Sequence, residues 1–432
     1  MGHKNCHDKL KKPRLIIKSI VDIYKYIHPF KTLPKGMFAV SLFGLFLGAS
    51  TTMVYSQLPM FMKYELHASA LKIAFIDGVV EFLSFLVRIF SGAASDYIRN
   101  RKFILLIGSL IILSIKPLFA LAKSAAMVMF AQSVDRIGNG FQASPRDALI
   151  ADLSNEHTRG QSFGFSKSLK TIGSLLGSAI AIALMYFIDN NYRIVFMLSI
   201  MPVIIAIICL YNLQSHKKSE PIIVEDYKRL KNPFKGKYLK SMDMAFWKLI
   251  ILASLCELGH FSEHLLVLRA NDFIGRGYAG SVGIFISIGQ VLCSYPIGLY
   301  ADKLGKKIFI QLCMIMMIVA SASMIYAPSI SIVFFGAFLW GGQMTAIQGL
   351  FLSIISDKVD KHLIGTAIGI YYLTIGVSFL VASMIAGHLW NHFGSNLAFI
   401  YNIFCVLLSL SMFSFLYPKK ESNFVRSDLT RF

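Results

Sequence analysis

Charged residues are scarce in this sequence, and acidic residues are the scarcest. Charged residues make up 15% of the 432 residues, whereas soluble globular proteins average about 25%. Hydrophobic residues account for 55%, so the composition excludes an ordinary soluble domain and indicates an integral membrane protein. The formal net charge of +20 does not point to a nucleic-acid partner, because the basic residues collect in short loops between membrane-length segments.

Several motifs for catalysis or metal binding are also missing. The six cysteines form no CxxC pair, and five of them lie in apolar runs, so neither a disulfide framework nor a zinc site is expected. No GxxxxGK[ST] occurs, which argues against ATP as the energy source. No GxSxG or HExxH occurs either, which argues against a membrane enzyme. We expect no enzymatic activity, no metal and no cofactor, with a proton gradient as the energy source.

What the sequence does contain is a series of long apolar segments. Twelve reach the length of about 18 residues that a membrane-spanning helix needs. They cover residues 36–62, 70–95, 103–122, 125–151, 161–187, 193–213, 244–269, 279–301, 308–326, 329–355, 363–389 and 396–417. We therefore expect a basic N-terminal segment (1–35), a six-helix lobe (36–213), a polar linker (214–243), a second six-helix lobe (244–417) and a tail (418–432).

The basic residues also predict an orientation. Lysine and arginine concentrate in both tails and in the even-numbered gaps between spans, and cytoplasmic loops carry such an excess. Both termini and the linker are therefore expected in the cytoplasm, which makes the chain a multi-pass protein of the cytoplasmic (inner) membrane, in contact with the lipid bilayer.

The two halves of the chain repeat each other. "GAASDYIRNRK" (92–102) is echoed by "GLYADKLGKK" (298–307), with Gly92/Gly298 and Asp96/Asp302 each 206 positions apart. Asp152 and Gly164 recur as Asp357 and Gly369, 205 positions later. A parallel repeat of this kind is typical of a two-lobed transporter with its site at the lobe interface.

These motifs resemble those of the major facilitator superfamily across essentially the whole chain. The helix 2–3 loop motif of that family is matched by Gly298, Asp302, Lys303, Gly305, Lys306 and Lys307, and less closely by Gly92, Asp96, Arg101 and Lys102. "DRIGNG" (135–140) resembles the helix 4 motif, whose arginine would be Arg136. The spacing of Gly164, Gly173 and Gly177 reproduces a helix 5 antiporter motif, although Ser178 stands where that motif has proline. The stretches "PRDALIADLSNEHTRG", "SIKPLFALA" and "LVLRANDF" look like a bacterial permease branch of undefined substrate.

The resemblance implies an all-α fold of twelve transmembrane helices in two pseudo-symmetric six-helix lobes. It also implies that the loop-motif residues form a conformational latch, in which Asp96 would contact the start of helix 11 and Asp302 the start of helix 5. Contacts of a carboxylate with a helix N-terminus contribute about 0.3 to 1 kcal/mol, enough to bias two nearly balanced conformations. The alternative is that these charges only obey the positive-inside rule.

Charges inside the predicted spans mark candidate coupling or substrate residues, because a charge at the bilayer centre costs about 2.5 to 3.5 kcal/mol. Asp77, Glu81 and Arg88 fall on one stripe of a helix. Arg136 pairs with Asp135 or Glu81, or tunes a proton-carrying carboxylate. Lys170 attracts an anionic substrate group, or pairs with Asp77 or Glu81. Each of these charges also fits interhelical salt bridges.

The seventh span contains "CELGHFSEH", in which Glu257, His260 and His264 have helical spacing and Glu263 is adjacent. A stripe of glutamate and histidine could relay protons. The same spacing could hold a transition metal or hydrogen-bonded packing, and we expect no metal site.

The sequence thus predicts a secondary active transporter of a small molecule, monomeric and without a nucleic-acid partner. We expect alternating access coupled to protons, with export favoured by the helix 5 glycines. One alternative is proton-linked uptake of an anionic metabolite or metal chelate. Another is a non-transporting membrane sensor.

Overall fold

Helices make up almost all of the computed structural model, which describes residues 35–98, 101–154, 159–211, 213, 242–359 and 364–416. The N-terminal half contains α2 (Lys35–Tyr55), α3 (Leu58–Tyr64), α4 (Ala70–Ile98), α5 (Arg101–Leu121), α6 (Ala125–Leu153), α7 (Arg159–Phe187), α8 (Tyr192–Leu198) and α9 (Ile200–Tyr211). The C-terminal half contains α11 (Met244–Gly259), α12 (Glu263–Ala270), η4 (Ala279–Ser281), α13 (Val282–Leu304), α14 (Lys306–Ile325), α15 (Ile330–Lys358), α16 (Ile364–Phe393) and α17 (Ser395–Leu416). The tails apart from Lys35, and all but the last two residues of the predicted linker, fall outside the described residues.

Each of the twelve predicted spans coincides, within the described ranges, with one helix or with consecutive short helices. Nine helical segments of the described chain are long and apolar enough to cross a membrane. The other three predicted spans correspond to α4, α6 and α13. Several charged residues interrupt α4 and α6, and α13 contributes a shorter apolar stretch with η4, Ala279–Cys293.

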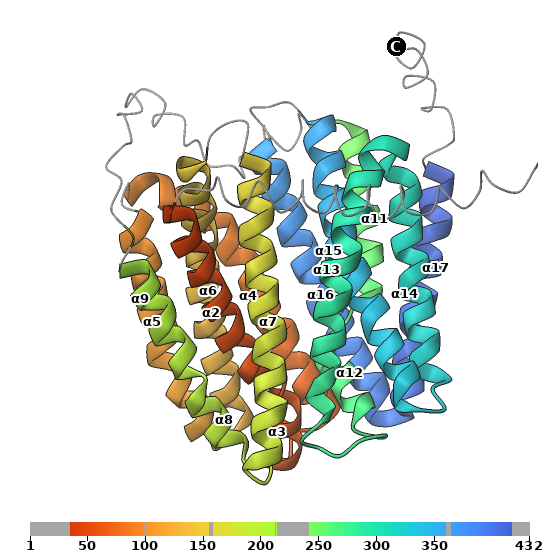
Figure 1. Cartoon of the computed structure of the whole chain (residues 1–432). Coiled ribbons are helices and arrows are strands. Elements are labelled where there is room, and N and C mark those ends of the chain that lie inside the picture. The colour runs from red at the N-terminus through yellow and green to blue at the C-terminus, as the bar shows by residue number, and fades with distance from the viewer. Residues whose placement is uncertain are drawn as a thin grey trace, which may run out of the picture.

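The helices stand side by side as two groups, the N-terminal one from red to yellow-green and the C-terminal one from green to blue (Figure 1). The groups meet mainly where α4 packs against α16 and where α7 packs against α13. The short helices α3, α8 and α12 lie toward the lower end in Figure 1. There the groups also touch through Tyr64, whose hydroxyl accepts a hydrogen bond from the Asn271 side chain at 2.9 Å.

Three spans predicted as single helices are broken, which corrects the expectation for 36–62, 193–213 and 244–269. The first breaks between α2 and α3, where Pro59 occupies the first turn of α3. The α8–α9 break falls at Ser199, whose backbone carbonyl accepts a hydrogen bond from Ser50 at 2.7 Å. The α11–α12 break follows Gly259, and Ser262 caps α12 by accepting from the backbone N–H of His264 at 3.2 Å. Each break exposes backbone groups that a side chain or another helix must satisfy.

The repeat in the sequence is reproduced by the structure. Gln57 and Ser262, which precede α3 and α12, are 205 positions apart, so corresponding helices of the two halves break at corresponding places. Arg101 at the start of α5 pairs with Asp152 at the end of α6. The equivalent ion pair, Lys306 with Asp357, joins the start of α14 to the end of α15.

Glycines hold α7 tightly against α2. A Cβ at Gly173 would lie 2.0 Å from the backbone oxygen of Leu45, and one at Gly177 would lie 2.2 Å from that of Ala49. Gly164 faces open space, with nothing within 4 Å. Two of the three helix 5 glycines therefore serve close helix packing.

We expect Gly173→Ala to destabilise the protein by about 1 to 3 kcal/mol, because the new methyl group meets backbone and the two helices must separate. Thermal unfolding in detergent measures the effect. Gly164→Ala is the matched control and should be neutral or slightly stabilising, since alanine favours a helix by up to about 1 kcal/mol. Equal stability of the two variants would contradict the packing role of Gly173.

Candidate functional site

A cavity of about 580 Å³ lies between the two groups of helices. Its walls come from α2, α4, α6 and α7 on one side and from α12, α13, α15 and α16 on the other. The acidic, basic and histidine residues that line it are Asp77, Glu81, Arg88, Arg136, Arg146, Asp147, Lys170, Glu263 and His264. Among these are five of the seven residues predicted for coupling or substrate binding: Asp77, Glu81, Arg136, Lys170 and Glu263.

Asp77 connects the two halves of the protein through this cavity. It lies on α4, and its Oδ2 accepts a hydrogen bond from the Ser262 hydroxyl at 2.6 Å. Its Oδ1 lies 3.3 Å from Nδ1 of His264, in the first turn of α12. The break before α12 makes this possible, because it brings Ser262 and the helix N-terminus to the carboxylate, where a negative charge is stabilised.

Glu81 lies one turn after Asp77 and pairs with Arg136 of α6, with Oε2 and Nη2 3.5 Å apart. Of the two partners predicted for Arg136, the structure therefore selects Glu81. The Arg136 guanidinium also lies 4.7 Å from the ring centroid of Tyr55. The Tyr55 ring is parallel to that of His264 at 6.4 Å, so Tyr55 links the ion pair to the other half of the protein.

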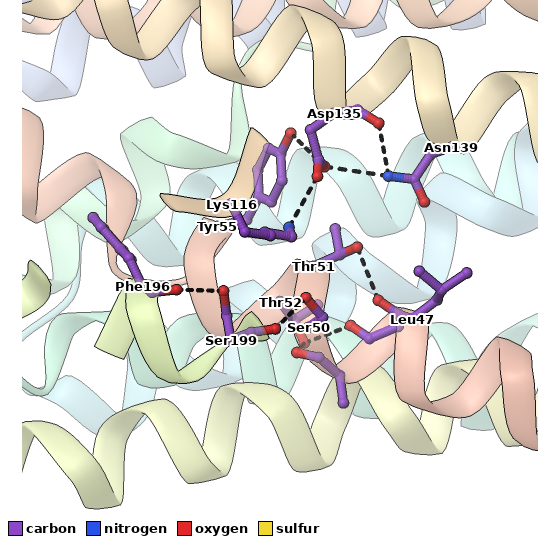
Figure 2. A network of polar contacts seen from close by, with 12 residues as sticks. Leu47, Ser50, Thr51, Thr52, Tyr55, Lys116, Asp135, Asn139, Phe196 and Ser199 are labelled. Carbon is purple, nitrogen blue, oxygen red and sulfur yellow. Dashed lines mark hydrogen bonds and ion pairs between the residues drawn. The ribbon is translucent and has the colours of Figure 1, made fainter. Parts of the chain in front are cut away.

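Asp135 has a different partner, which the sequence analysis missed. Its Oδ1 lies 2.9 Å from the Nζ of Lys116 on α5, and both side chains are completely buried. Tyr55 donates a hydrogen bond to Asp135 Oδ2 at 3.4 Å, and Asn139 donates to the same atom at 3.2 Å (Figure 2). The signal was visible in "SIKPLFALA", where a lysine inside an apolar run requires a buried partner.

Lys170 lies on α7 at the cavity wall. Among the described residues its side chain has no hydrogen bond or ion pair, so the predicted pairing with Asp77 or Glu81 is not formed. Two other cations, Arg88 and Arg146, line the same cavity, together with Asp147. Within the described part of the chain, Arg146 forms one ion pair, with the adjacent Asp147 at 3.4 Å.

Glu257 and His260 do not line the cavity. His260 Nδ1 lies 3.5 Å from Glu257 Oε1, and the His260 ring packs 5.1 Å from Trp340. The expectation that Glu257, His260 and His264 share one helical stripe is wrong, because α11 ends at Gly259 and α12 begins at Glu263. The break turns His264 toward Asp77 and leaves His260 inside its own half.

The predicted latch residues are described only in part. Arg101 also donates to the backbone oxygen of Ala148, and Lys102 donates to the backbone oxygens of Tyr211 at 2.9 Å and of Leu213 at 2.5 Å. These contacts, like that of Lys306, stay within one half of the protein. Gly305 adopts φ of 102° between α13 and α14, a conformation that favours glycine. The side chains of Asp96, Asp302 and Lys303 and the surroundings of Gly92 and Gly298 lie outside what the structure describes, so the latch remains a prediction.

No cluster of three or more histidine, cysteine, aspartate or glutamate side chains able to hold a metal ion occurs in the described ranges.

Comparison with known proteins decides the family. The family model described as Major Facilitator Superfamily matches residues 40–265 and 265–430. The chain belongs to the major facilitator superfamily. It is a multi-pass membrane transporter of this superfamily's type, with the superfamily's all-α fold.

An uncharacterized MFS-type transporter of Methanocaldococcus jannaschii is 24% identical over 391 residues, which cover 88% of this chain and 94% of the relative. Among solved structures, the nucleoside transporter NupG superposes with a TM-score of 0.69 at 12% identity, over 89% of this chain and all of NupG. A D-xylose–proton symporter superposes with a TM-score of 0.67 at 15% identity, over 87% of this chain and 96% of the symporter. At these identities the structures establish the shared fold alone.

We expect Lys116→Met to destabilise this transporter by about 3 to 5 kcal/mol, because it leaves the Asp135 carboxylate buried without a cation. Thermal unfolding in detergent reports the loss. The double variant Lys116→Met with Asp135→Asn should recover most of it, since no unpaired charge remains. Lys123→Met, at an exposed lysine just after α5, is the control and should change little; a similar loss there would contradict the assignment.

Proposed function

We propose that this protein is a secondary active transporter that moves a small molecule by alternating access and couples that movement to protons. The observation that carries the proposal is the contact of Asp77 with Ser262 and His264, at 2.6 and 3.3 Å. It places a titratable carboxylate inside the cavity, at a contact between the two halves. An ionisable group at such a place within a membrane span is a functional group by default.

Protonation of Asp77 changes the strength of this contact. The ionised carboxylate accepts the Ser262 hydrogen bond and attracts the polar N–H groups at the start of α12. The neutral acid loses most of that attraction, so the two halves are held together less firmly. A difference of 1.4 kcal/mol between two conformations changes their ratio about tenfold, which is within the reach of one charge-assisted hydrogen bond.

The groups around Asp77 favour exchange of a proton at this place. Glu81 and Glu263 add negative charge on the cavity wall, and Arg136 adds a permanent positive charge beside Glu81. His264 faces Asp77 directly, with Nδ1 3.3 Å from Oδ1, and an imidazole nitrogen can donate or accept a proton. A proton that enters the cavity therefore finds several acceptor groups, and protonation of one changes the proton affinity of the others through their charges.

The orientation completes the proposal. We infer from the basic loops that the helix ends at Ile98, Arg101, Leu153 and Arg159 face the cytoplasm. The cavity extends from the helix breaks toward those ends, to Arg88 and Arg146. We assign this arrangement to the inward-facing state. The D-xylose–proton symporter has the same fold, which makes proton coupling compatible with this architecture. The close packing of Gly173 and Gly177 against α2 explains their spacing without export, so the direction is decided by transport measurements.

Proteoliposomes that contain a pH-sensitive dye test the coupling. Sulfate, inorganic phosphate, succinate, glucose 6-phosphate, glucose and choline are added in turn to the full-length protein, and internal pH and solute are followed together. We expect a transported solute to accumulate against its gradient only while a pH gradient is present. Asp77→Asn should abolish both accumulation and the accompanying pH change, and should retain exchange of solute across the membrane.

Asp189→Asn, in the exposed turn between α7 and α8, serves as the control and should behave as the natural protein. Accumulation that continues after the pH gradient is collapsed would refute proton coupling. Proton-coupled accumulation that survives Asp77→Asn would refute the role of this carboxylate.

A further inference from the structure

The charges of the cavity are divided into two groups of opposite sign. The acidic group consists of Asp77, Glu81 and Glu263, with Arg136 as its cation. The basic group consists of Arg88, Arg146 and Lys170, with Asp147 as its anion. The formal charge is therefore negative in one group and positive in the other, although the cavity as a whole is balanced.

The two groups occupy different depths. On α4, Arg88 follows Glu81 by seven residues, which corresponds to about 10 Å of helix. On α6, Arg146 follows Arg136 by ten residues, or about 15 Å. The acidic group thus lies beside the helix breaks, and the basic group lies toward the end at which α4 ends and α7 begins. One small molecule bound at the basic group leaves the acidic group accessible to protons.

Within the basic group, Lys170 is the residue whose charge lacks a paired anion among the described residues. Its ammonium has no hydrogen bond or ion pair within the described ranges, and the cations Arg88 and Arg146 line the same cavity, with Asp147 as the one nearby anion of the group. Gathering like charges in a partly desolvated space is unfavourable unless a counter-charge is supplied. An anionic group bound there supplies it.

The backbone holds Lys170 in place for such a role. A Cβ at Gly48 of α2 would lie 2.6 Å from the backbone oxygen of Lys170, so the two helices are in direct contact at this residue. Lys170 is therefore presented from a closely packed helix pair. The packing fixes the backbone from which the Lys170 side chain extends, so the position of its Cα is set before a ligand binds.

Neutral polar side chains line the cavity together with the two charged groups. They include Thr51, Ser84, Asn139, Ser174, Ser287 and Gln290. Hydroxyl and amide groups can donate and accept hydrogen bonds, and they suit the polar body of a ligand better than an apolar one. The lining thus favours a hydrophilic molecule over a lipophilic cation.

We propose that the transported substrate is a small hydrophilic organic anion whose carboxylate or phosphate group is bound by Lys170 and Arg146. This inference rests on the proposed transport function and names the substrate class of the same cavity. In this proposal the two groups have different roles: the basic group binds the substrate, and the acidic group carries the proton.

Ligand-induced stabilisation of the full-length protein in nanodiscs, without any gradient, tests the assignment. The probes are sulfate, inorganic phosphate, succinate and glucose 6-phosphate, compared with glucose, choline chloride and sodium chloride at matched ionic strength. We expect one or more of the four anions to raise the unfolding temperature in a saturable way, since binding to the folded state stabilises it by mass action. Glucose, choline and sodium chloride should not.

Lys170→Gln should weaken the apparent affinity about 30-fold or abolish the shift, as expected for loss of one partner of a buried charge pair. Lys170→Arg keeps the charge and should retain binding, which separates loss of the site from loss of the fold. Lys167→Gln, one turn earlier on the exposed side of α7, is the matched control and should bind like the natural protein.

The inference is overturned if none of the four anions stabilises the protein, if choline or glucose does so equally, or if Lys170→Gln binds the anions unchanged. Because binding is measured without a gradient, the result is independent of coupling. A protein that binds anions through Lys170 but transports them without protons would refute the proposed coupling and leave the anion site intact.

Discussion

The cost of placing charge in hydrocarbon governs the structure of this transporter. Every ionisable side chain inside a span has to find a partner or a polar space, and the described residues show both solutions. Lys116 and Asp135 neutralise each other where both are fully buried. Asp77, Glu81, Arg136 and Lys170 line the cavity instead. The polar interior between the two halves is therefore a direct consequence of where the charged residues lie along the helices.

The broken helices also leave backbone polar groups inside the membrane that need hydrogen-bond partners. A helix that ends inside the membrane leaves N–H and C=O groups that lipid cannot satisfy. Ser262 meets this need at the start of α12, and the same hydroxyl donates to Asp77 of the other half. One side chain thus serves the local cap and the interface at once. The position of the equivalent break, 205 residues earlier at Gln57, shows that the repeat extends to the irregular parts of the fold.

The sequence predicted the helices well, because hydropathy and length are properties of each segment alone. The two-lobed repeat was likewise visible in motif spacing, and the family was recognised from the loop motif around Gly298. Side-chain partners were harder to predict from the sequence, because they depend on the rotation of each helix about its axis. Asp77, Glu81 and Arg88 share a stripe in both the prediction and the structure, yet the partner of Asp135 was missed. The prediction that Glu257, His260 and His264 share one stripe was wrong because it treated residues 244–269 as one helix. Gly259, which ends α11, and Ser262, which caps α12, are the local signals that divide this segment.

The buried pair of Lys116 and Asp135 has a consequence for how the chain enters the bilayer. If α5 left the translocation machinery alone, Lys116 would face lipid at a cost of about 2.5 to 3.5 kcal/mol. Asp135 would bring a similar cost to α6. The connection between Leu121 and Ala125 is short, so the second helix can enter beside the first. Entry as a hairpin pairs the two charges and lowers both costs. Biogenesis of the N-terminal half therefore favours entry of these two helices as one unit.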